Sequence, residues 1–446
     1  MIDISREALT VLMLGGFFFG VLSGFPLALV IGTVGLVAGI LRFGPMVTME
    51  LLYTRSVDGA LFNYTLIAVP LFIFMGLMLE RSGLAEKLFD ALYVWLGGFR
   101  GGLAVIVVLM GTIIAATVGV IAASVTMLTI VALRPMVSRG YSKSLASGAI
   151  CAGGCLGILI PPSIMLVLYG PMAQISVGKL FFGAFIPGLI LSGLYISYIL
   201  IHSLLKPEIA PAVPSAETRI PFLQKTTKLL TAMVPLAILI LSVLGVIFFG
   251  VASPTEASGI GAMAATLLTI AYGRFNFKVL RDVSLEGFRS VGFIFLIVIM
   301  AFSFVGVFIA AGCDRVISSV ILSVPGGKWG IFAIIMFIAF IMGFFIDWIG
   351  IVFILVPIIT PIAETLGFNE LWFAMMIIVN LQMSFMTPPF AWAIFFLRGQ
   401  APPDLGITLT DIIRGVIPYV ILIMIGLGLL IAFPQLILWL PGQMIR

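Results

Sequence analysis

The sequence predicts an all-α integral membrane protein, built as an inverted repeat with two re-entrant helical hairpins and two discontinuous helices. Three observations support this prediction. The 446 residues are 62% hydrophobic and 9% charged, with a mean hydropathy of +1.29. Pro-Pro pairs interrupt two long apolar stretches, at Pro161–Pro162 and at Pro388–Pro389. The two pairs lie 227 residues apart, which is about half the chain.

The composition excludes a soluble domain, because soluble domains have roughly a quarter of their residues charged. Met1–Arg6 runs directly into an apolar stretch, so we expect no cleavable signal peptide. A net charge of +5 would suggest a nucleic-acid ligand in a soluble protein. Here the excess is better explained by loop Lys and Arg residues that follow the positive-inside rule. The predicted surroundings are a lipid bilayer, with no nucleic-acid partner.

Few residues are available for enzyme chemistry. The chain has three cysteines and one histidine, His202, and it lacks Gly-x-Ser-x-Gly and His-Glu-x-x-His motifs. Cys151 and Cys155 are four residues apart and are interpreted as small packing residues rather than metal ligands. We therefore predict that the protein is not an enzyme and carries no cofactor apart from transported coupling ions.

Twelve apolar segments are candidates to span or enter the bilayer, for which about 20 helical residues are needed. The first set is 7–23, 26–42, 62–80, 102–134, 143–170 and 180–205, and the second is 229–249, 254–272, 290–312, 330–362, 371–397 and 415–441.

Two of these segments, 102–134 and 330–362, have an unusual length. Each holds about 33 residues, too many for one span and few for two. A re-entrant hairpin of two half-length helices fits this length. The alternative is one strongly tilted and kinked helix.

Two further segments, 143–170 and 371–397, contain the proline pairs and are predicted to be broken helices. Proline has no N–H to donate, and its ring clashes with the carbonyl four residues earlier. In lipid such a break survives only where it faces protein or a water-filled cavity. Broken helices at matching places in two halves of a chain are typical of the binding site of a secondary transporter.

The chain aligns with itself at an offset of 227 to 228 residues, which indicates an internal duplication. We predict a first repeat at 1–205, a polar and proline-rich flexible linker at 206–228, and a second repeat at 229–446. The matching landmarks are Pro26 with Pro254, Gly98–Gly102 with Gly326–Gly330, and Pro161–Pro162 with Pro388–Pro389.

Loop charges predict the orientation of the two repeats. The loop after the first hairpin carries Arg134, Arg139 and Lys143 without an acid, so it is expected in the cytoplasm together with the 206–228 linker. The loop after the second hairpin carries Glu364 and Glu370 without a base and is expected outside. The two hairpins would then enter from opposite faces of the membrane, as in an inverted repeat.

The first proline pair predicts a cation site. Pro161 and Pro162 remove hydrogen bonds from the carbonyls of Gly157 and Ile158, and exposed carbonyl oxygens suit a small hard cation such as sodium. Ser163 starts the next half-helix, where its hydroxyl can cap free N–H groups or reach a ligand. The alternative at either pair is a packing kink without a ligand.

The second proline pair has the same pattern. Pro388 and Pro389 are expected to free the carbonyls of Ser384 and Phe385. Additional side-chain oxygens and amides come from Asn380, Gln382, Ser384 and Thr387.

The hairpins supply the other candidates. Ser124 ends a run of small residues at 115–124, which would let a hairpin tip approach closely. Asp347 is the lone charge in its apolar run, and an ionisable residue within the membrane indicates function. The alternative is an aspartate that caps a helix end. Glu256, at a helix start, is interpreted as a cap. Because half-helix N-termini favour anions, the substrate is predicted to be a small carboxylate.

Five stretches resemble the large membrane subunit of the tripartite ATP-independent periplasmic (TRAP) transporters, the DctM-like large permeases. The resemblance covers essentially the whole chain. The stretches are VPLFIFMGLMLERSG (69–83), GGCLGILIPPSIMLVLYG (153–170), ASPTEASGIGA (252–262), FFIDWIGIVFILVPIITPI (344–362) and NLQMSFMTPPFAWAIFFLRG (380–399).

This resemblance implies sodium-coupled uptake of a small organic acid across the bacterial inner membrane, by an elevator movement of a transport domain against a scaffold. It also implies two partners, a small four-helix membrane subunit and a periplasmic substrate-binding protein. The implied sodium positions are Gly154, Gly157, Pro161, Ser384, Thr387 and Pro388, and the implied substrate-binding positions are Ser124, Ser163, Asp347 and Asn380. The alternatives are a related ion-coupled organic-anion carrier that works without a binding protein, and a channel.

Overall fold

The computed structural model describes residues 4–214, 221–389 and 391–445, and only the backbone of residues 115–118. The regular structure of these residues is helical throughout. The α-helices are α1 (Arg6–Leu22), α2 (Leu27–Phe43), α3 (Pro45–Ser56), α4 (Ala68–Arg81), α5 (Leu84–Leu96), α6 (Gly102–Val118), α7 (Ile121–Leu128), α8 (Arg134–Ser138), α9 (Lys143–Cys155), α10 (Ile164–Ala173), α11 (Val177–Leu205), α13 (Phe222–Phe248), α14 (Pro254–Ala271), α15 (Phe277–Ala310), α16 (Cys313–Leu322), α17 (Gly327–Phe345), α18 (Trp348–Thr365), α19 (Glu370–Ser384), α20 (Trp392–Gln400), α21 (Leu409–Ala432) and α22 (Gln435–Leu438).

Short turns of tighter or wider helix join these elements. The π-helical turns are η1 (Val57–Leu61) and η3 (Thr129–Leu133), and the 3-10 turns are η2 (Tyr64–Ile67), η4 (Leu156–Ile158), η5 (Pro207–Ile209), η6 (Pro403–Leu405) and η7 (Pro441–Gln443).

Eight helical stretches in the described residues are long and apolar enough to cross a membrane, judged by length and composition. The prediction of an all-helical multi-span membrane protein is confirmed at this level. The longest is α15 with 34 residues, or about 51 Å at 1.5 Å per residue. It begins at Phe277 rather than at 290, because its first turns are charged yet continue the same helix.

Three helices were missed by the search for long apolar segments. They are α3, α5 and α16, with 12, 13 and 10 residues. Each is short and mixes charged with apolar residues, so none is apolar for a full span. Their sequence signal is the helical spacing of the apolar residues rather than total hydropathy.

The prediction of a flexible linker over 206–228 is wrong at both ends. Val213 donates its N–H to the Gly97 carbonyl, and the Ala210 carbonyl accepts the Gly101 N–H, so this part packs against the start of α6. Ala210 and Val213 are buried. At the other end, α13 already begins at Phe222.

The two segments of unusual length are each divided into two helices. The helix ends at Val118 and resumes at Ile121 in the first, and it ends at Phe345 and resumes at Trp348 in the second. The joints contain extended backbone, with φ −135° at Val120 and −125° at Ile346. Neither segment is one continuous kinked helix. The helices α6, α17 and α18 have 17, 19 and 18 residues, longer than the half-length arms expected.

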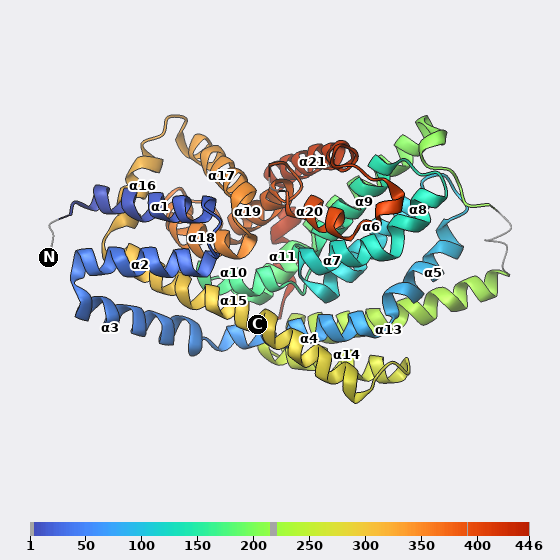
Figure 1. Cartoon of the computed structure of the whole chain (residues 1–446), viewed down its shortest axis with the longest axis horizontal. Coiled ribbons are helices and arrows are strands. Elements are labelled where there is room, and N and C mark those ends of the chain that lie inside the picture. The colour runs from blue at the N-terminus through green and yellow to red at the C-terminus, as the bar shows by residue number, and fades with distance from the viewer. Residues whose placement is uncertain (1–3, 215–220, 390, 446) are drawn as a thin grey trace.

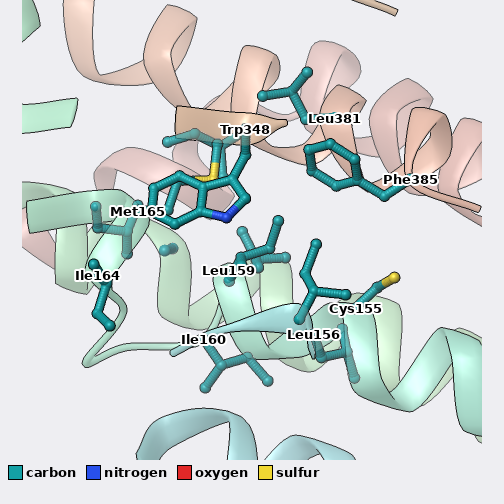
Figure 2. Packing of buried hydrophobic residues seen from close by; sticks show 14 of the residues in the cluster. Cys155, Leu156, Leu159, Ile160, Ile164, Met165, Trp348, Leu381 and Phe385 are labelled. Atoms are coloured by element: carbon teal, nitrogen blue, oxygen red, sulfur yellow. The ribbon is translucent and has the colours of Figure 1, made fainter. Parts of the chain in front are cut away.

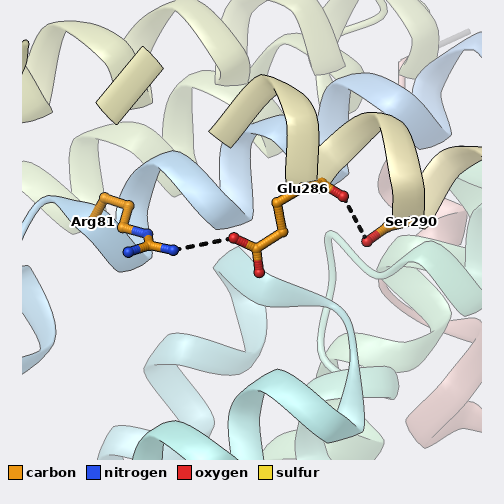
Figure 3. Close-up of polar contacts among 3 residues, drawn as sticks. All are labelled: Arg81, Glu286 and Ser290. Carbon is orange, nitrogen blue, oxygen red and sulfur yellow. Dashed lines mark hydrogen bonds and ion pairs between the residues drawn. The ribbon is translucent and has the colours of Figure 1, made fainter. Parts of the chain in front are cut away.

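The helices pack in two groups (Figure 1). One group joins α2, α3, α4, α13, α14 and α15. The other joins α6, α9, α11, α17, α19 and α21. Contacts of α10 with α4 and of α18 with α15 connect the groups. Within the first group, an ion pair between Arg81 and Glu286 (3.1 Å) ties the end of α4 to α15 (Figure 3).

Helix starts recur at a nearly constant offset along the chain. Leu27 and Pro254, Ile121 and Trp348, and Lys143 and Glu370 each begin helices and each lie 227 residues apart. The same spacing was used to align the proline pairs in the sequence. The helix order of the first half is therefore repeated in the second.

Candidate functional site

Both helices that carry a proline pair are interrupted at that pair. The first helix ends with η4 at Ile158 and resumes as α10 at Ile164. The second ends at Ser384 and resumes as α20 at Trp392. Both Pro-Pro peptide bonds are cis. The interruption follows from the two missing N–H donors, because the chain cannot continue the helical hydrogen bonds through them.

The first break lies entirely inside the protein. Every residue from 145 to 170 is buried, including Pro161 and Ser163. A break in this position meets the requirement that irregular backbone at membrane depth be surrounded by protein. It is also isolated from bulk water, so a charge held there would interact strongly with nearby dipoles.

One carbonyl predicted to be free at the first break is already satisfied. The Ser163 hydroxyl donates to the Ile158 carbonyl at 2.6 Å, and it makes no capping bond to the N–H groups of α10. The prediction of a free Ile158 carbonyl and a capping Ser163 is therefore wrong, since the two groups pair with each other. The Ser163 oxygen keeps lone pairs for a ligand after this donation.

The first hairpin segment packs directly on the first break. A Cβ placed on Gly157 would lie 2.7 Å from Ser124 Oγ, and one on Gly154 would lie 2.4 Å from Val125 Cγ2. At the joint before α7, a Cβ on Gly119 would lie 3.5 Å from Ser163 Cα. The structure thus brings Ser124, Gly154, Gly157 and Ser163 into one compact cluster, which we call the first cluster together with Pro161.

The hydroxyl of Ser124 has no hydrogen-bond partner among the described residues, although its oxygen is buried. A buried hydroxyl without a partner costs about 1–3 kcal/mol. The Val120 carbonyl lies 3.8 Å from the point where a Gly157 Cβ would be. Hydroxyl and carbonyl oxygens at such a place are the ligands that hard cations prefer.

The second break differs from the first in exposure. Pro388 and Pro389 are exposed and Thr387 is half-buried. The carbonyls expected to be free are satisfied, because Ser384 accepts from the Thr387 N–H (3.3 Å) and Phe385 from the Ala393 N–H (3.1 Å). The prediction of two free carbonyls is therefore wrong here.

The hydroxyl groups at the second break donate back into their own helix. Ser384 Oγ donates to the Leu381 carbonyl at 2.9 Å, and Thr387 Oγ1 donates to the Met383 carbonyl at 2.8 Å. Such a hydroxyl presents its lone pairs away from the helix, as a bound cation requires. A Cβ on Gly343 would lie 2.1 Å from Ser384 Oγ, so α17 and α19 touch at this point.

Two amides of α19 have opposite environments. Asn380 Nδ2 donates to the Met336 carbonyl at 2.7 Å and so fastens α19 to α17. Gln382 is fully buried, and neither its Oε1 nor its Nε2 has a hydrogen-bond partner among the described residues. Asn380 therefore has a structural bond in place, whereas Gln382 presents two unused polar atoms in the protein interior.

The start of α18 lies between the two broken helices. Figure 2 shows the Trp348 indole beside Leu159 and Met165 of the first break, with Leu381 and Phe385 of α19 on its other side. Asp347, the preceding residue, is the N-cap of α18, but its side chain makes no capping hydrogen bond. The capping alternative is right about its position and is not supported by a bond.

The halves of the chain also exchange contacts. After the first break, α10 packs on α18 of the second half, and after the second break, α20 packs on α7 of the first half. Sequence reasoning missed Trp348, which joins the two breaks. Its signal was a large aromatic residue directly after the isolated Asp347.

The remaining sequence interpretations concern residues outside the breaks. Cys151 and Cys155 are fully buried, as expected for packing residues. Among the described residues, no group of three or more His, Cys, Asp or Glu side chains is placed to hold a metal ion. Glu256 forms a capping box with Ser253 at the start of α14, so its interpretation as a cap is confirmed.

Comparisons with known proteins place these features in a family context. Residues 14–436 match the family described as "Tripartite ATP-independent periplasmic transporter, DctM component". The C4-dicarboxylate TRAP transporter large permease protein DctM of Pseudomonas aeruginosa is 30% identical over 381 residues, covering 85% of this chain and 87% of that protein. The ectoine TRAP transporter large permease protein TeaC of Halomonas elongata is 28% identical, covering 95% and 97%.

A third relative and a solved structure extend the comparison. The sialic acid TRAP transporter large permease protein SiaM of Vibrio cholerae is 27% identical, covering 86% of this chain and 87% of that protein. The crystal structure of the YdaH transporter of Alcanivorax borkumensis is similar in fold, with a TM-score of 0.64 at 17% identity, covering 96% of this chain and 99% of that one.

Proposed function

The chain belongs to the DctM-component family of the TRAP transporters, and on this premise we propose that it couples the uptake of a small organic acid to sodium. Membership makes it a multi-pass protein of the bacterial inner membrane and a transporter permease, not an enzyme. The family resemblance predicted from five sequence stretches is confirmed. The coupling ion, the site and the transport movement are the proposed parts.

The observation that carries sodium coupling is the Ser124–Gly157 contact. It leaves an unpartnered hydroxyl oxygen beside the end of η4, in a buried part of the protein. We assign the first sodium ion to this first cluster, around Gly154, Gly157 and Pro161. A second ion is assigned to Ser384, Thr387 and Pro388, where two hydroxyl groups present their lone pairs. Hydroxyl and carbonyl oxygens together provide a ligand set for a hard cation.

The proposed substrate is a small carboxylate bound near Ser124, Ser163, Asp347 and Asn380. The helices α10 and α18 begin at this place, and helix N-termini favour anions. Relatives are named for C4-dicarboxylates, ectoine and sialic acid, each of which contains a carboxylate. Sodium and carboxylate would neutralise one another in surroundings of low dielectric constant, so binding them together is favourable.

The proposed movement is of the elevator type, with an inverted repeat. The recurrent helix starts, 227 residues apart, support a duplication, and the opposite loop charges support its inversion. We propose that 102–134 and 330–362 act as re-entrant hairpins. The second helix group would carry the site across the membrane as a transport domain, while the first group would serve as the scaffold.

Large permeases of this family imply two partners in general, a small membrane subunit and a periplasmic binding protein. We propose that this chain works with both, and that the small subunit has four helices. The second candidate is an ion-coupled organic-anion carrier that needs no binding protein, which the YdaH-like fold makes a fair comparison. Reconstituted carrier with and without added binding protein separates these candidates, because only the tripartite system requires the protein for uptake.

Sodium binding is tested on the purified full-length permease without knowing its substrate. The melting temperature is measured in NaCl and in choline chloride at equal ionic strength. An ion that binds only the folded state at a hundredfold excess over Kd stabilises it by about 2.7 kcal/mol. We expect a sodium-dependent rise in the wild type that is lost in S124A. A wild type that melts equally in both salts would contradict sodium coupling.

A further inference from the structure

An open groove lies between α13 and α14, away from the broken helices. It encloses about 510 Å³, and its walls are apolar residues that include Leu230, Val234 and Leu268. Helix α5 packs on α13 beside it (Figure 1). A groove of this kind on a membrane-facing helix pair has the dimensions and lining of a site for a hydrocarbon chain.

The apolar surface continues along both helices from the groove. On α13, Leu230, Val234, Ile238 and Leu241 are all exposed and recur at helical spacing. They cover 11 residues of helix, about 16 Å, which is close to the half-thickness of a bilayer core of about 30 Å. On α14, Met263, Leu267 and Ile270 form the matching exposed stripe.

Tyr272 closes one end of the groove. Its hydroxyl donates to the Thr231 carbonyl at 2.8 Å, which ties the end of α14 to α13. The Lys87 ammonium of α5 lies 3.9 Å from the centre of the Tyr272 ring. A tyrosine at the end of an apolar groove, with a cation beside it, is typical of the boundary between hydrocarbon and headgroups.

Two further cations belong to the same end. Arg274 follows Tyr272 by two residues, and its Nε lies 3.6 Å from the point where a Gly83 Cβ would be. Lys228 is one turn before Thr231, whose hydroxyl donates to the Lys228 carbonyl at 3.0 Å. The ion pairs found among the described residues are Arg81–Glu286 and Arg134–Asp404, so none of these three cations is neutralised by a carboxylate partner.

We propose that this groove binds an anionic phospholipid. One acyl chain occupies the groove along α13 and α14, and the phosphate sits on Lys87, Lys228 and Arg274 beside Tyr272. Clustered Lys and Arg at the end of a membrane helix recognise anionic headgroups. The bound lipid joins α5 to the α13–α14 pair, and it is independent of the sodium and substrate sites.

The test uses native mass spectrometry of the full-length protein after removal of co-purified lipid. Phosphatidylglycerol and phosphatidylcholine with identical acyl chains are compared at equal concentration. The wild type is expected to retain phosphatidylglycerol selectively, and each neutralised cation should weaken it about fivefold. Equal retention of the two lipids would overturn the headgroup assignment. Equal occupancy by glycerol phosphate, which has no acyl chain, would overturn the lipid in favour of a free anion.

Variants locate the site. K87Q/K228Q/R274Q should lose the selectivity, and V234W, which fills the groove, should lose the lipid while keeping all three cations. The matched control is K328Q, because Lys328 also lies over an aromatic ring, 5.7 Å from the centre of Trp329, but on α17. Selectivity that survives both the triple variant and V234W would place the lipid elsewhere and overturn the proposal. The single variant K87Q gives an independent measurement if the triple variant does not fold.

Discussion

Ser124 and Gly157 lie directly against each other, where the start of α7 meets the end of η4. A Cβ on Gly157 would stand 2.7 Å from Ser124 Oγ and 3.4 Å from Ser124 Cβ. The glycine is therefore required by the serine, because any side chain at 157 would occupy the space of the hydroxyl. The hydroxyl in turn is buried without a partner among the described residues, beside the first proline pair.

Gly157→Ala is expected to destabilise the protein by about 1–3 kcal/mol, since it overpacks a rigid contact. It should also abolish the sodium-dependent rise in melting temperature. Gly259→Ala is the matched control, because a Cβ at 259 meets nothing within 4 Å and alanine favours the helix. The double variant S124G/G157A should recover stability but not the response to sodium. A G157A protein that melts like the wild type in both salts would show that the contact does not exist.

Ser124→Ala and Ser163→Ala remove hydroxyl groups with different roles. S124A removes a group without a partner, so the sodium-free protein should keep its stability or gain some. S163A leaves the buried Ile158 carbonyl without its donor and should cost about 1–3 kcal/mol even without sodium. Melting curves of both variants in choline chloride and NaCl measure this difference. Equal losses in choline chloride would contradict the assignment of a structural bond to Ser163 alone.

Gly343→Ala should destabilise the α17–α19 contact, since its Cβ would stand 2.1 Å from Ser384 Oγ and 2.5 Å from Ser384 Cβ. We expect a loss of about 1–3 kcal/mol. Ser384→Gly in the same chain should restore much of the stability, because it removes both atoms. Denaturant or thermal unfolding of the two single variants and the double variant measures the coupling. Strictly additive effects would show that positions 343 and 384 do not touch.

Asn380→Leu and Gln382→Leu compare a bonded amide with an unbonded one on the same helix. N380L leaves the Met336 carbonyl without its donor and should cost about 1–3 kcal/mol. Q382L replaces two unpartnered polar atoms with apolar ones of similar size and should be neutral or stabilising in the absence of ligand. Uptake of a labelled C4-dicarboxylate by reconstituted carrier then tests the amide itself. A stable Q382L protein with unchanged uptake would remove Gln382 from the site.

The arrangement of the broken helices could be predicted from sequence, because proline acts locally. Pro161–Pro162 and Pro388–Pro389 lack N–H donors whatever surrounds them, so each must end its helix. The positions of the breaks, the long helices and the helical joints near Val120 and Asp347 follow from such local properties. The family likewise follows from short contiguous stretches.

The state of the freed polar groups could not be predicted from sequence. The Ile158 carbonyl found a donor in Ser163, and the Ser384 and Phe385 carbonyls found backbone donors beyond the prolines. The amphipathic helices α3 and α5 were also missed, because a search by hydropathy alone weighs composition rather than spacing. In each case the outcome depends on which partner the folded chain brings near.

The sequence by itself determined where helices run, where they break, and which family the chain belongs to, because these depend on the covalent chemistry of adjacent residues. Only the tertiary structure decided that Pro161 is buried while Pro388 is exposed, and that Trp348 stands between the two breaks. It also decided that Ser124 keeps an unused hydroxyl. Burial and pairing are set by residues far apart in the chain, and folding satisfies buried polar groups from whatever element lies closest.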